Sequence, residues 1–126
     1  MTMITETGRA LRERAQGRKA PQLQQALVEL DGKLGQWSDE FIFGDVWDGD
    51  EMSFEECMLV AITALAATGR TNQLRNYLHG ALQNGIPADK LQSALRMLVV
   101  YIGFPGAIGA LQELQTAVKV HERAQK

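Results

Sequence analysis

The sequence predicts an all-α fold, a single domain built as a bundle of about six helices. Apolar residues recur every three or four positions through most of the 126 residues, as they do along one face of an α-helix. Glycines and prolines separate these stretches, and aromatic residues, which favour strands, make up only 6% of the chain. A chain of this length can bury one hydrophobic core.

Composition and charge argue against several classes of partner. Hydrophobic residues at 45% and charged residues at 22% are ordinary for a globular protein, and a net charge of −2 gives no reason to expect nucleic acid or an anionic membrane. No window of about eighteen uncharged apolar residues is present, so no transmembrane helix is expected. The N-terminus lacks the apolar core of a signal peptide, and a single cysteine suits a reducing compartment, so we expect a cytoplasmic protein.

Residues 1–20 are expected to form a polar, basic helical arm, and residues 21–126 the helical domain itself. The basic residues of the arm are interspersed along a short helix, which is typical of a solvated face rather than of an arm that binds nucleic acid. They are Arg9, Arg12, Arg14, Arg18 and Lys19. Pro21 suits the first turn of the next helix, because its φ is already fixed near the helical value.

The first long apolar stripe follows Pro21. Its members are three or four residues apart, which predicts a helix over 21–41 that packs within the domain or against a neighbouring subunit. Gly32 and Gly35 each weaken such a helix by about 1 kcal/mol relative to alanine, so a bend or break is expected near them. The stripe consists of Leu23, Leu27, Leu30, Leu34, Trp37 and Phe41.

Residues 41–53 (FIFGDVWDGDEMS) are predicted to form a loop, because they are rich in acids and glycines. The acids do not match a calcium-binding EF-hand loop. That motif would place Trp47 at its third position, where an oxygen ligand is required, and would have no glycine at its sixth. Calcium is therefore not expected to bind there.

Four further helices are expected, each bounded by a capping or breaking signal. Ser53 and Glu56 form a capping box that starts the first of them, which is apolar almost all round and is therefore expected to be buried. Thr71 is expected to cap the second. The expected ranges are 53–69, 72–84, 88–102 and 106–123, with Gly69, Gly85 and Gly103 at the helix ends.

His79 is the first candidate for chemistry. On a helical wheel of residues 72–84 it lies at the edge of the apolar face, one turn after Arg75, where a ring can line a pocket while partly shielded from water. An imidazole in that position can titrate near neutral pH and transfer protons. The spacing leaves open a structural role, as a boundary histidine bonded to a carboxylate or a carbonyl.

Two aromatic residues and one cysteine are weaker candidates. Trp47 and Tyr101 could wall a small-molecule pocket, although single aromatic residues at such positions also serve in a core. Cys57 lies one turn inside the 53–69 helix, where the neighbouring Glu55 and Glu56 oppose a thiolate, so an inert thiol is expected.

Metal and nucleotide sites have no support in the sequence. His79 and His121 are the two histidines, and neither belongs to a pair with metal-binding spacing. No glycine-rich loop follows a strand, so no nucleotide fingerprint is present.

With these residues in view, the chain resembles the carboxymuconolactone decarboxylase family, which shares its fold with alkylhydroperoxidase D. The matching segments have the family's order and spacing over about residues 41–114. They are FGDVW (43–47), the helix ending ALAATGR, the run NQLRNYLHGALQNGIPADKL and the turn YIGFPGAIGAL. The most specific part holds His79, Gly85 and the Tyr101-x-Gly103-x-Pro105 turn.

The resemblance implies an alkylhydroperoxidase D-like helical domain that assembles into a homo-oligomer, commonly a trimer or a hexamer, with sites near subunit contacts. It also implies a decarboxylase without a cofactor, in which a lactone bearing a carboxylate loses carbon dioxide and is reprotonated. The family's histidine falls on His79, which would be the proton-transfer residue. Trp47, Arg75 and Tyr101 are the expected walls of the substrate pocket.

Two departures from the family pattern bear on the activity. Decarboxylase relatives usually carry arginine and polar residues in the first turn of the 53–69 helix, where this chain has EECM (55–58), so Arg75 or Arg70 would have to bind the substrate's carboxylate. Redox relatives carry C-x-x-C just ahead of the histidine, and this chain has no cysteine there, so disulfide-based peroxidase chemistry is not expected.

Three functions are therefore compatible with the sequence. The first is a cofactor-free decarboxylase that acts on a small lactone or related carboxylate through His79. The second is a family member that binds a small molecule or serves as an oligomeric subunit without the parent reaction. The third is a single-thiol redox protein that uses Cys57.

Overall fold

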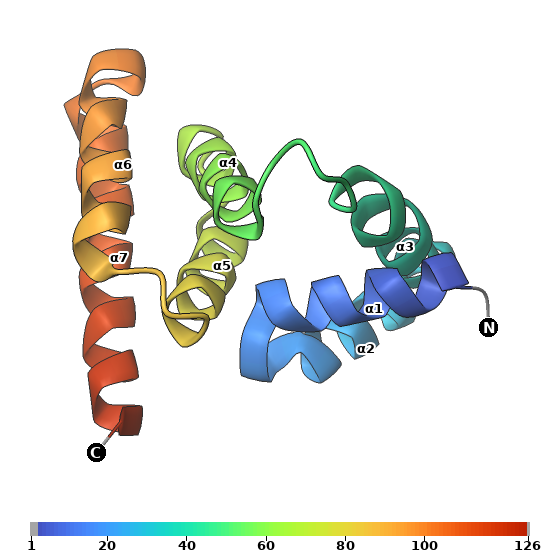
Figure 1. The fold of residues 1–126 in the computed structure, drawn as a ribbon. Coiled ribbons are helices and arrows are strands. Elements are labelled where there is room, and N and C mark those ends of the chain that lie inside the picture. Colours follow the sequence, from blue (N-terminus) through green and yellow to red (C-terminus); the bar gives the residue numbers. More distant parts are fainter. Residues whose placement is uncertain (1–2, 126) are drawn as a thin grey trace. The chain divides into compact units, whose positions relative to one another are not determined.

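The computed structural model describes residues 3–125, and every regular element in this range is helical. The predicted all-α class is therefore confirmed. None of the described helices is long and apolar enough to cross a membrane. The elements are α1 (Met3–Gln16), η1 (Gly17–Lys19), α2 (Ala20–Leu30), α3 (Gly32–Trp37), η2 (Ser38–Val46), α4 (Phe54–Ala67), α5 (Thr71–Gln83), α6 (Ala88–Ile102) and α7 (Phe104–Gln125) (Figure 1).

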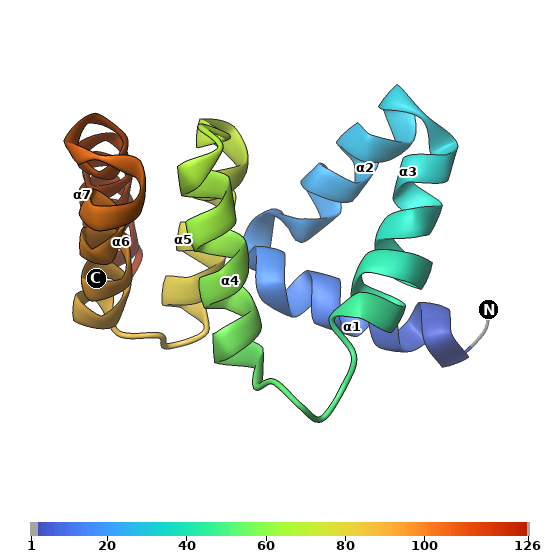
Figure 2. The ribbon, with the colours of Figure 1, turned by 90° about the horizontal axis from the view of Figure 1, so that it is seen from above.

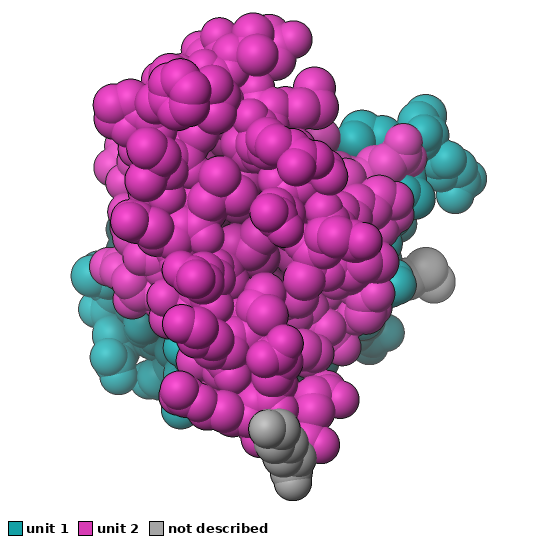
Figure 3. Space-filling model, turned by 90° about the vertical axis from the view of Figure 1, so that its left-hand side faces the viewer, with its two compact units in different colours: residues 1–54 teal, residues 55–126 magenta. Residues whose placement is uncertain are grey.

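The chain divides into two compact units, residues 1–54 and residues 55–126, which Figure 3 colours separately. The first unit contains the elements from α1 to η2. The second contains α4 to α7, apart from the first residue of α4. The boundary predicted at residue 20, between a basic arm and a helical domain, stays a prediction.

The predicted helix over 21–41 breaks close to the expected place. The backbone of Asp31 is extended (φ −166°, ψ 122°), which ends α2, and its side chain accepts a hydrogen bond from the backbone N–H of Lys33 and so caps α3. Several members of the apolar stripe are exposed in the single chain, so packing against a neighbouring subunit stays a prediction for them. These exposed members are Leu30, Leu34, Trp37 and Phe41.

The segment η2 is π-helical, so the loop predicted over 41–53 is wrong for residues 41–46. The backbone N–H of Trp47 donates to the carbonyl of Ile42, five residues earlier, at 2.8 Å, which is the bond of a π-helix. Phe43 lies in this segment and is fully buried, and Gly44 is buried as well. The glycine that indicated a loop instead lies at a close contact between two helices.

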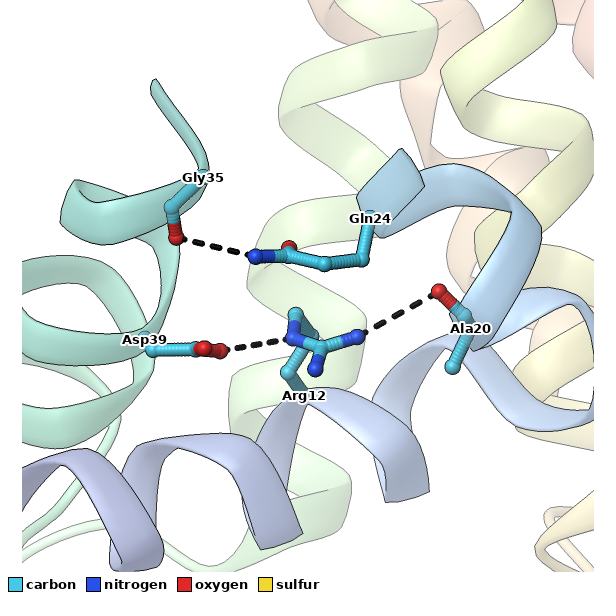
Figure 4. A network of polar contacts seen from close by, with 5 residues as sticks. All are labelled: Arg12, Ala20, Gln24, Gly35 and Asp39. Atoms are coloured by element: carbon cyan, nitrogen blue, oxygen red, sulfur yellow. Dashed lines mark hydrogen bonds and ion pairs between the residues drawn. The ribbon is translucent and has the colours of Figure 1, made fainter. Parts of the chain in front are cut away.

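Arg12 corrects the expected solvated face of the basic arm, because only 4% of this residue is exposed. Its Nε donates to Asp39 Oδ1 at 2.7 Å, and its Nη1 donates to the carbonyl of Ala20 at 3.3 Å. Figure 4 shows these contacts beside a third, from Gln24 Nε2 to the carbonyl of Gly35 at 3.1 Å. The buried guanidinium joins α1, the start of α2 and η2, and the paired carboxylate makes its burial tolerable. The other basic residues of the segment are exposed, as predicted.

In the second unit, α7 packs against both α5 and α6, and Figure 2 shows α6 and α7 side by side. The three helices meet through apolar stripes at helical spacing. Their buried members include Leu74, Leu78, Leu82, Leu91, Leu95, Leu98, Ala107, Ala110, Leu114 and Ala117. The predicted ranges of these helices agree with the structure within two residues at each end.

The helix ends of the second unit lie at the glycines predicted to end them. Gly69, Gly85 and Gly103 have φ values of +71°, +83° and +85°, a conformation that residues with a Cβ atom rarely adopt. The helix α5 begins at Thr71 itself, so Arg70 occupies the N-cap position that the sequence suggested for Thr71.

The helix α4 begins immediately after Ser53, as the capping box predicts, but it is not buried all round. Met58, Ile62 and Ala66 form one buried stripe, whereas Val60 on another side is 57% exposed. A single chain therefore covers only part of this apolar helix.

Replacing Gly8 by alanine should destabilise the first unit by about 1–3 kcal/mol, the usual cost of forcing extra volume into packed contacts. A Cβ atom at Gly8 would collide with the backbone of Asp39 and come within 2.8 Å of the backbone nitrogen of Gly44, and backbone atoms cannot rotate away. Urea unfolding followed by circular dichroism measures the loss.

Gly32→Ala is the matched control, because a Cβ atom there would meet nothing within 4 Å. This variant should match the wild type or exceed its stability by up to about 1 kcal/mol, the helix preference of alanine over glycine. Equal stability of Gly8→Ala and the wild type would contradict the close crossing of α1 and η2.

Candidate functional site

The candidate site lies in the second unit and begins with two polar residues on α5. Leu74 and Leu78 are buried on the apolar face of this helix, and Arg75 and His79 each follow one of them. Because they are four residues apart, Arg75 and His79 lie one turn apart on the same rim of the helix. His79 is half-buried, as its place on the helical wheel predicts.

Glu113 on α7 forms an ion pair with Arg75. Its carboxylate accepts two hydrogen bonds from one guanidinium, from Arg75 Nε to Oε2 at 3.0 Å and from Arg75 Nη2 to Oε1 at 3.1 Å. Such a two-point ion pair fixes the orientation of both planar groups as well as their separation. It connects α5 to α7 on the side where the two helices pack.

The charges of this cluster reinforce one another. Hydrogen bonds from Arg75 lower the pKa of Glu113; burial opposes that shift, and the positive charges of Arg75 and His79 add to it. The same hydrogen bonds, followed by the charge of Glu113, raise the pKa of Arg75. Glu113 is therefore an anion at neutral pH.

A pocket of about 320 Å³ opens beside this cluster, lined by the end of α4, the start of α5 and the first half of α7. Its size is at the small end of the range for ligand sites. Glu113 forms part of its wall, and Arg70 is the cation in its lining. The lining residues are Leu65, Ala66, Gly69, Arg70, Thr71, Leu74, Pro105, Gly106, Gly109, Ala110, Gln112 and Glu113.

A larger hollow of about 610 Å³ lies along α7 beside the start of α6. Its lining is mostly apolar, with Lys119 and Glu122 among its polar members. None of the four predicted site residues lines either pocket. The smaller pocket is the better candidate because its wall contains Arg70 and also Glu113, the partner of Arg75.

Of the four predicted site residues, Arg75 is bound to Glu113 of the pocket wall, and His79 lies one turn after it on α5. Neither Arg75 nor His79 is part of the pocket lining. Tyr101 is 73% exposed on α6 and lines neither pocket. Trp47 belongs to the first unit, where its ring packs on those of Phe43 and Phe54 at 5.0 and 6.1 Å between centroids. The roles predicted for these four residues stay predictions.

Glu113 is the residue that the sequence did not single out. It lies 38 positions after Arg75, and nothing local in the chain marks the two as partners. Only the packing of α7 on α5 makes the contact possible. Cys57 is partly exposed on α4, and its predicted inertness stays a prediction. Among the described residues, no three histidine, cysteine or acidic side chains come together as a metal-binding group.

Comparison with known proteins agrees with the resemblance drawn from the sequence. A model of the carboxymuconolactone decarboxylase family matches residues 32–116, a range that includes α5, the pocket and Glu113. The chain is also similar to a protein named 4-carboxymuconolactone decarboxylase from Acinetobacter baylyi, with 29% identity over 79 residues. That match covers 63% of this chain and 59% of the relative, so the chain aligns with about three fifths of the relative's length.

Glu113→Gln should lower the free energy of unfolding at pH 7, and the difference from the wild type should disappear in acid. The pKa of Glu113 is lowered on folding, so the ion pair contributes fully above the pKa of an unfolded glutamate, about 4.3. The contribution is lost as the pH falls through the lower folded value. Urea unfolding at neutral and at strongly acidic pH measures both states.

Glu55→Gln is the control, because it removes the partner of Lys90 in a more exposed pair at 3.0 Å. It should cost less stability at pH 7 than Glu113→Gln. A Glu113→Gln defect that stays the same from pH 7 to strong acid would contradict the ion pair as its source.

Proposed function

Because the chain belongs to the carboxymuconolactone decarboxylase family, we propose that it is a cofactor-free decarboxylase-type enzyme acting on a small carboxylated lactone or a related carboxylate. His79 is the proposed proton-transfer residue. The observation that carries this proposal is the place of the half-buried His79, one turn after Arg75 on α5, where Arg75 holds Glu113 of the pocket wall.

The chemistry requires a proton donor and a means of stabilising charge. The bond between the carboxylate carbon and the ring carbon breaks, carbon dioxide leaves, and the electron pair remains on the lactone as an enolate-like system. A proton from the imidazolium of His79 then forms the new C–H bond at a carbon of this enolate-like system. His79 lies one turn after Arg75 on α5, on the side of the helix that carries the ion pair with Glu113.

Measuring carbon dioxide release from carboxymuconolactone tests the proposal. His79→Ala should lower kcat by about 100-fold or more, the usual contribution of a positioned acid or base, with a much smaller change in KM. His121→Ala is the matched control, because that residue is the other histidine of the chain and lines neither pocket. Its kcat should equal that of the wild type. Absence of turnover by the wild type would exclude this activity.

A second candidate function is binding of a small carboxylate, or a role as an oligomeric subunit, without decarboxylation. This second function is favoured because charged residues near the candidate site are already paired with one another. Glu55, in the first turn of α4, is paired with Lys90, and Arg75 is already bound to Glu113. Saturable binding of a carboxylate without release of carbon dioxide would support this second function.

We also propose that the chain assembles into a trimer or hexamer, in the cytoplasm as its single cysteine suggests. Large apolar residues are exposed at helical spacing along the end of α6 and the start of α7, and monomeric proteins rarely leave such a surface uncovered. These residues, called the α6–α7 stripe below, are Met97, Val100, Tyr101, Phe104 and Ile108. An exposed Tyr101 also fits a substrate site that a neighbouring subunit completes.

Light scattering after gel filtration should give a mass of about three or six times the 13.9 kDa of one chain. The double variant Met97→Glu/Val100→Glu should reduce that mass, because it places charges in the proposed apolar contact. Ser93→Glu, at an exposed polar position earlier on the same helix, should leave the mass unchanged. A wild type of 13.9 kDa at micromolar concentration would contradict the assembly.

A further inference from the structure

We propose that Arg70 binds the carboxylate of a small ligand in the pocket between α4, α5 and α7. The inference rests on the proposed function for the choice of a carboxylate as the ligand. It goes beyond that function by naming the residue that would bind the carboxylate. That residue is Arg70 and not Arg75, the other arginine near the pocket.

The backbone holds Arg70 at the rim of the pocket. Gly69 turns the chain sharply with φ at +71°, which a residue with a side chain rarely adopts. The backbone N–H of Arg70 then donates to the carbonyl of Leu65 at 2.9 Å, and its carbonyl accepts from the N–H of Leu74 at 2.8 Å. Arg70 is thus tied to the last turn of α4 and to the first turn of α5. Its side chain starts from a fixed point between the two helices.

The charges of the pocket favour an anion. Glu113 supplies a negative charge to the wall, but the two hydrogen bonds from Arg75 already offset it. The guanidinium of Arg70 is exposed and has no hydrogen bond or ion pair to any residue that the structure describes. The charges of Arg70 and Glu113 in the wall sum to zero, and Arg75, which lies outside the lining but is bound to Glu113, brings the group of three to a net charge of +1. A planar guanidinium with free donors matches a carboxylate at two points.

Arg75 is less suited to this role. Its Nε and Nη2 are both engaged by Glu113, so a ligand carboxylate would have to displace a carboxylate that is already in place. That displacement would leave Glu113 as an unpaired anion in the wall, directly beside the incoming anion. Repulsion between the two carboxylates opposes this arrangement.

The rest of the pocket has the shape and polarity for the body of a small ligand. Part of the lining is apolar and is formed by Leu65, Ala66 and Leu74. Such a surface favours contact with the carbon atoms of a ligand over contact with water. Gly109 in the lining leaves open space, because a Cβ atom there would meet nothing within 4 Å. A longer side chain at Gly109 would occupy the space that a ligand needs.

The test is a titration followed by the backbone amide signals of Gly69, Arg70 and Gly109 in NMR spectra. The probe is γ-butyrolactone-γ-carboxylate, and its methyl ester is the uncharged counterpart. The carboxylate should give saturable shifts, and the ester should bind about tenfold more weakly or worse, a difference of about 1.4 kcal/mol. Arg70→Gln should weaken carboxylate binding by about the same factor.

Matched control variants distinguish loss of the Arg70 charge, or of space in the pocket, from a general loss of structure. Arg123→Gln removes the same charge from α7 at a residue outside the pocket lining, and it should bind the probe as the wild type does. Gly109→Leu should abolish binding by filling the pocket. Gly109→Ala adds one methyl group and favours the helix, so it should retain most of the binding.

Three results would overturn the proposal. The first is no binding of the carboxylate to the wild type, and the second is equal or tighter binding of inorganic phosphate at the same amides. The third is loss of binding in the double variant Arg75→Gln/Glu113→Gln with binding retained in Arg70→Gln. Binding that depends on Arg70, without release of carbon dioxide, would instead sink the decarboxylase function and leave this inference standing.

Discussion

The ion pair between Arg75 and Glu113 is the contact around which the candidate site of the second unit is built. It joins α5 to α7 with two hydrogen bonds, on the side where these helices pack. It also decides the charge of the pocket, because a neutralised Glu113 leaves Arg70 as the cation without a partner in the described lining. His79 lies one turn after Arg75 on the same helix, α5. One salt bridge therefore sets both the geometry and the electrostatics of the candidate site.

The first unit contains another ion pair, between Arg12 and Asp39, which is buried. Arg12 and Asp39 are both buried, and removing two ions from water is costly unless they are paired and further hydrogen-bonded. Arg12 meets this condition by also donating to Ala20, so the pair joins three segments. The neighbouring close crossing at Gly8 and the π-helical turn show a unit whose helices meet through backbone contacts as much as through large side chains.

The single chain leaves apolar surface on several helices uncovered. Val60 on α4, Trp37 and Phe41 in the first unit, and the α6–α7 stripe are all exposed. The sequence alone predicted packing for Trp37 and Phe41 and burial for the helix that carries Val60. Periodicity tells which residues prefer to leave water, but it does not tell whether the covering surface belongs to the same chain.

The sequence by itself determined the helical class, the ends of the last helices and the place of His79 on the rim of α5. These features depend on neighbours within about four residues: periodic apolar positions and glycines with positive φ. Only the tertiary structure decided that Arg12 is buried, that residues 41–46 are helical and that Glu113 holds Arg75. Each of these depends on a partner from 27 to 38 positions away in the chain, or on the close passage of another helix, which no local pattern encodes.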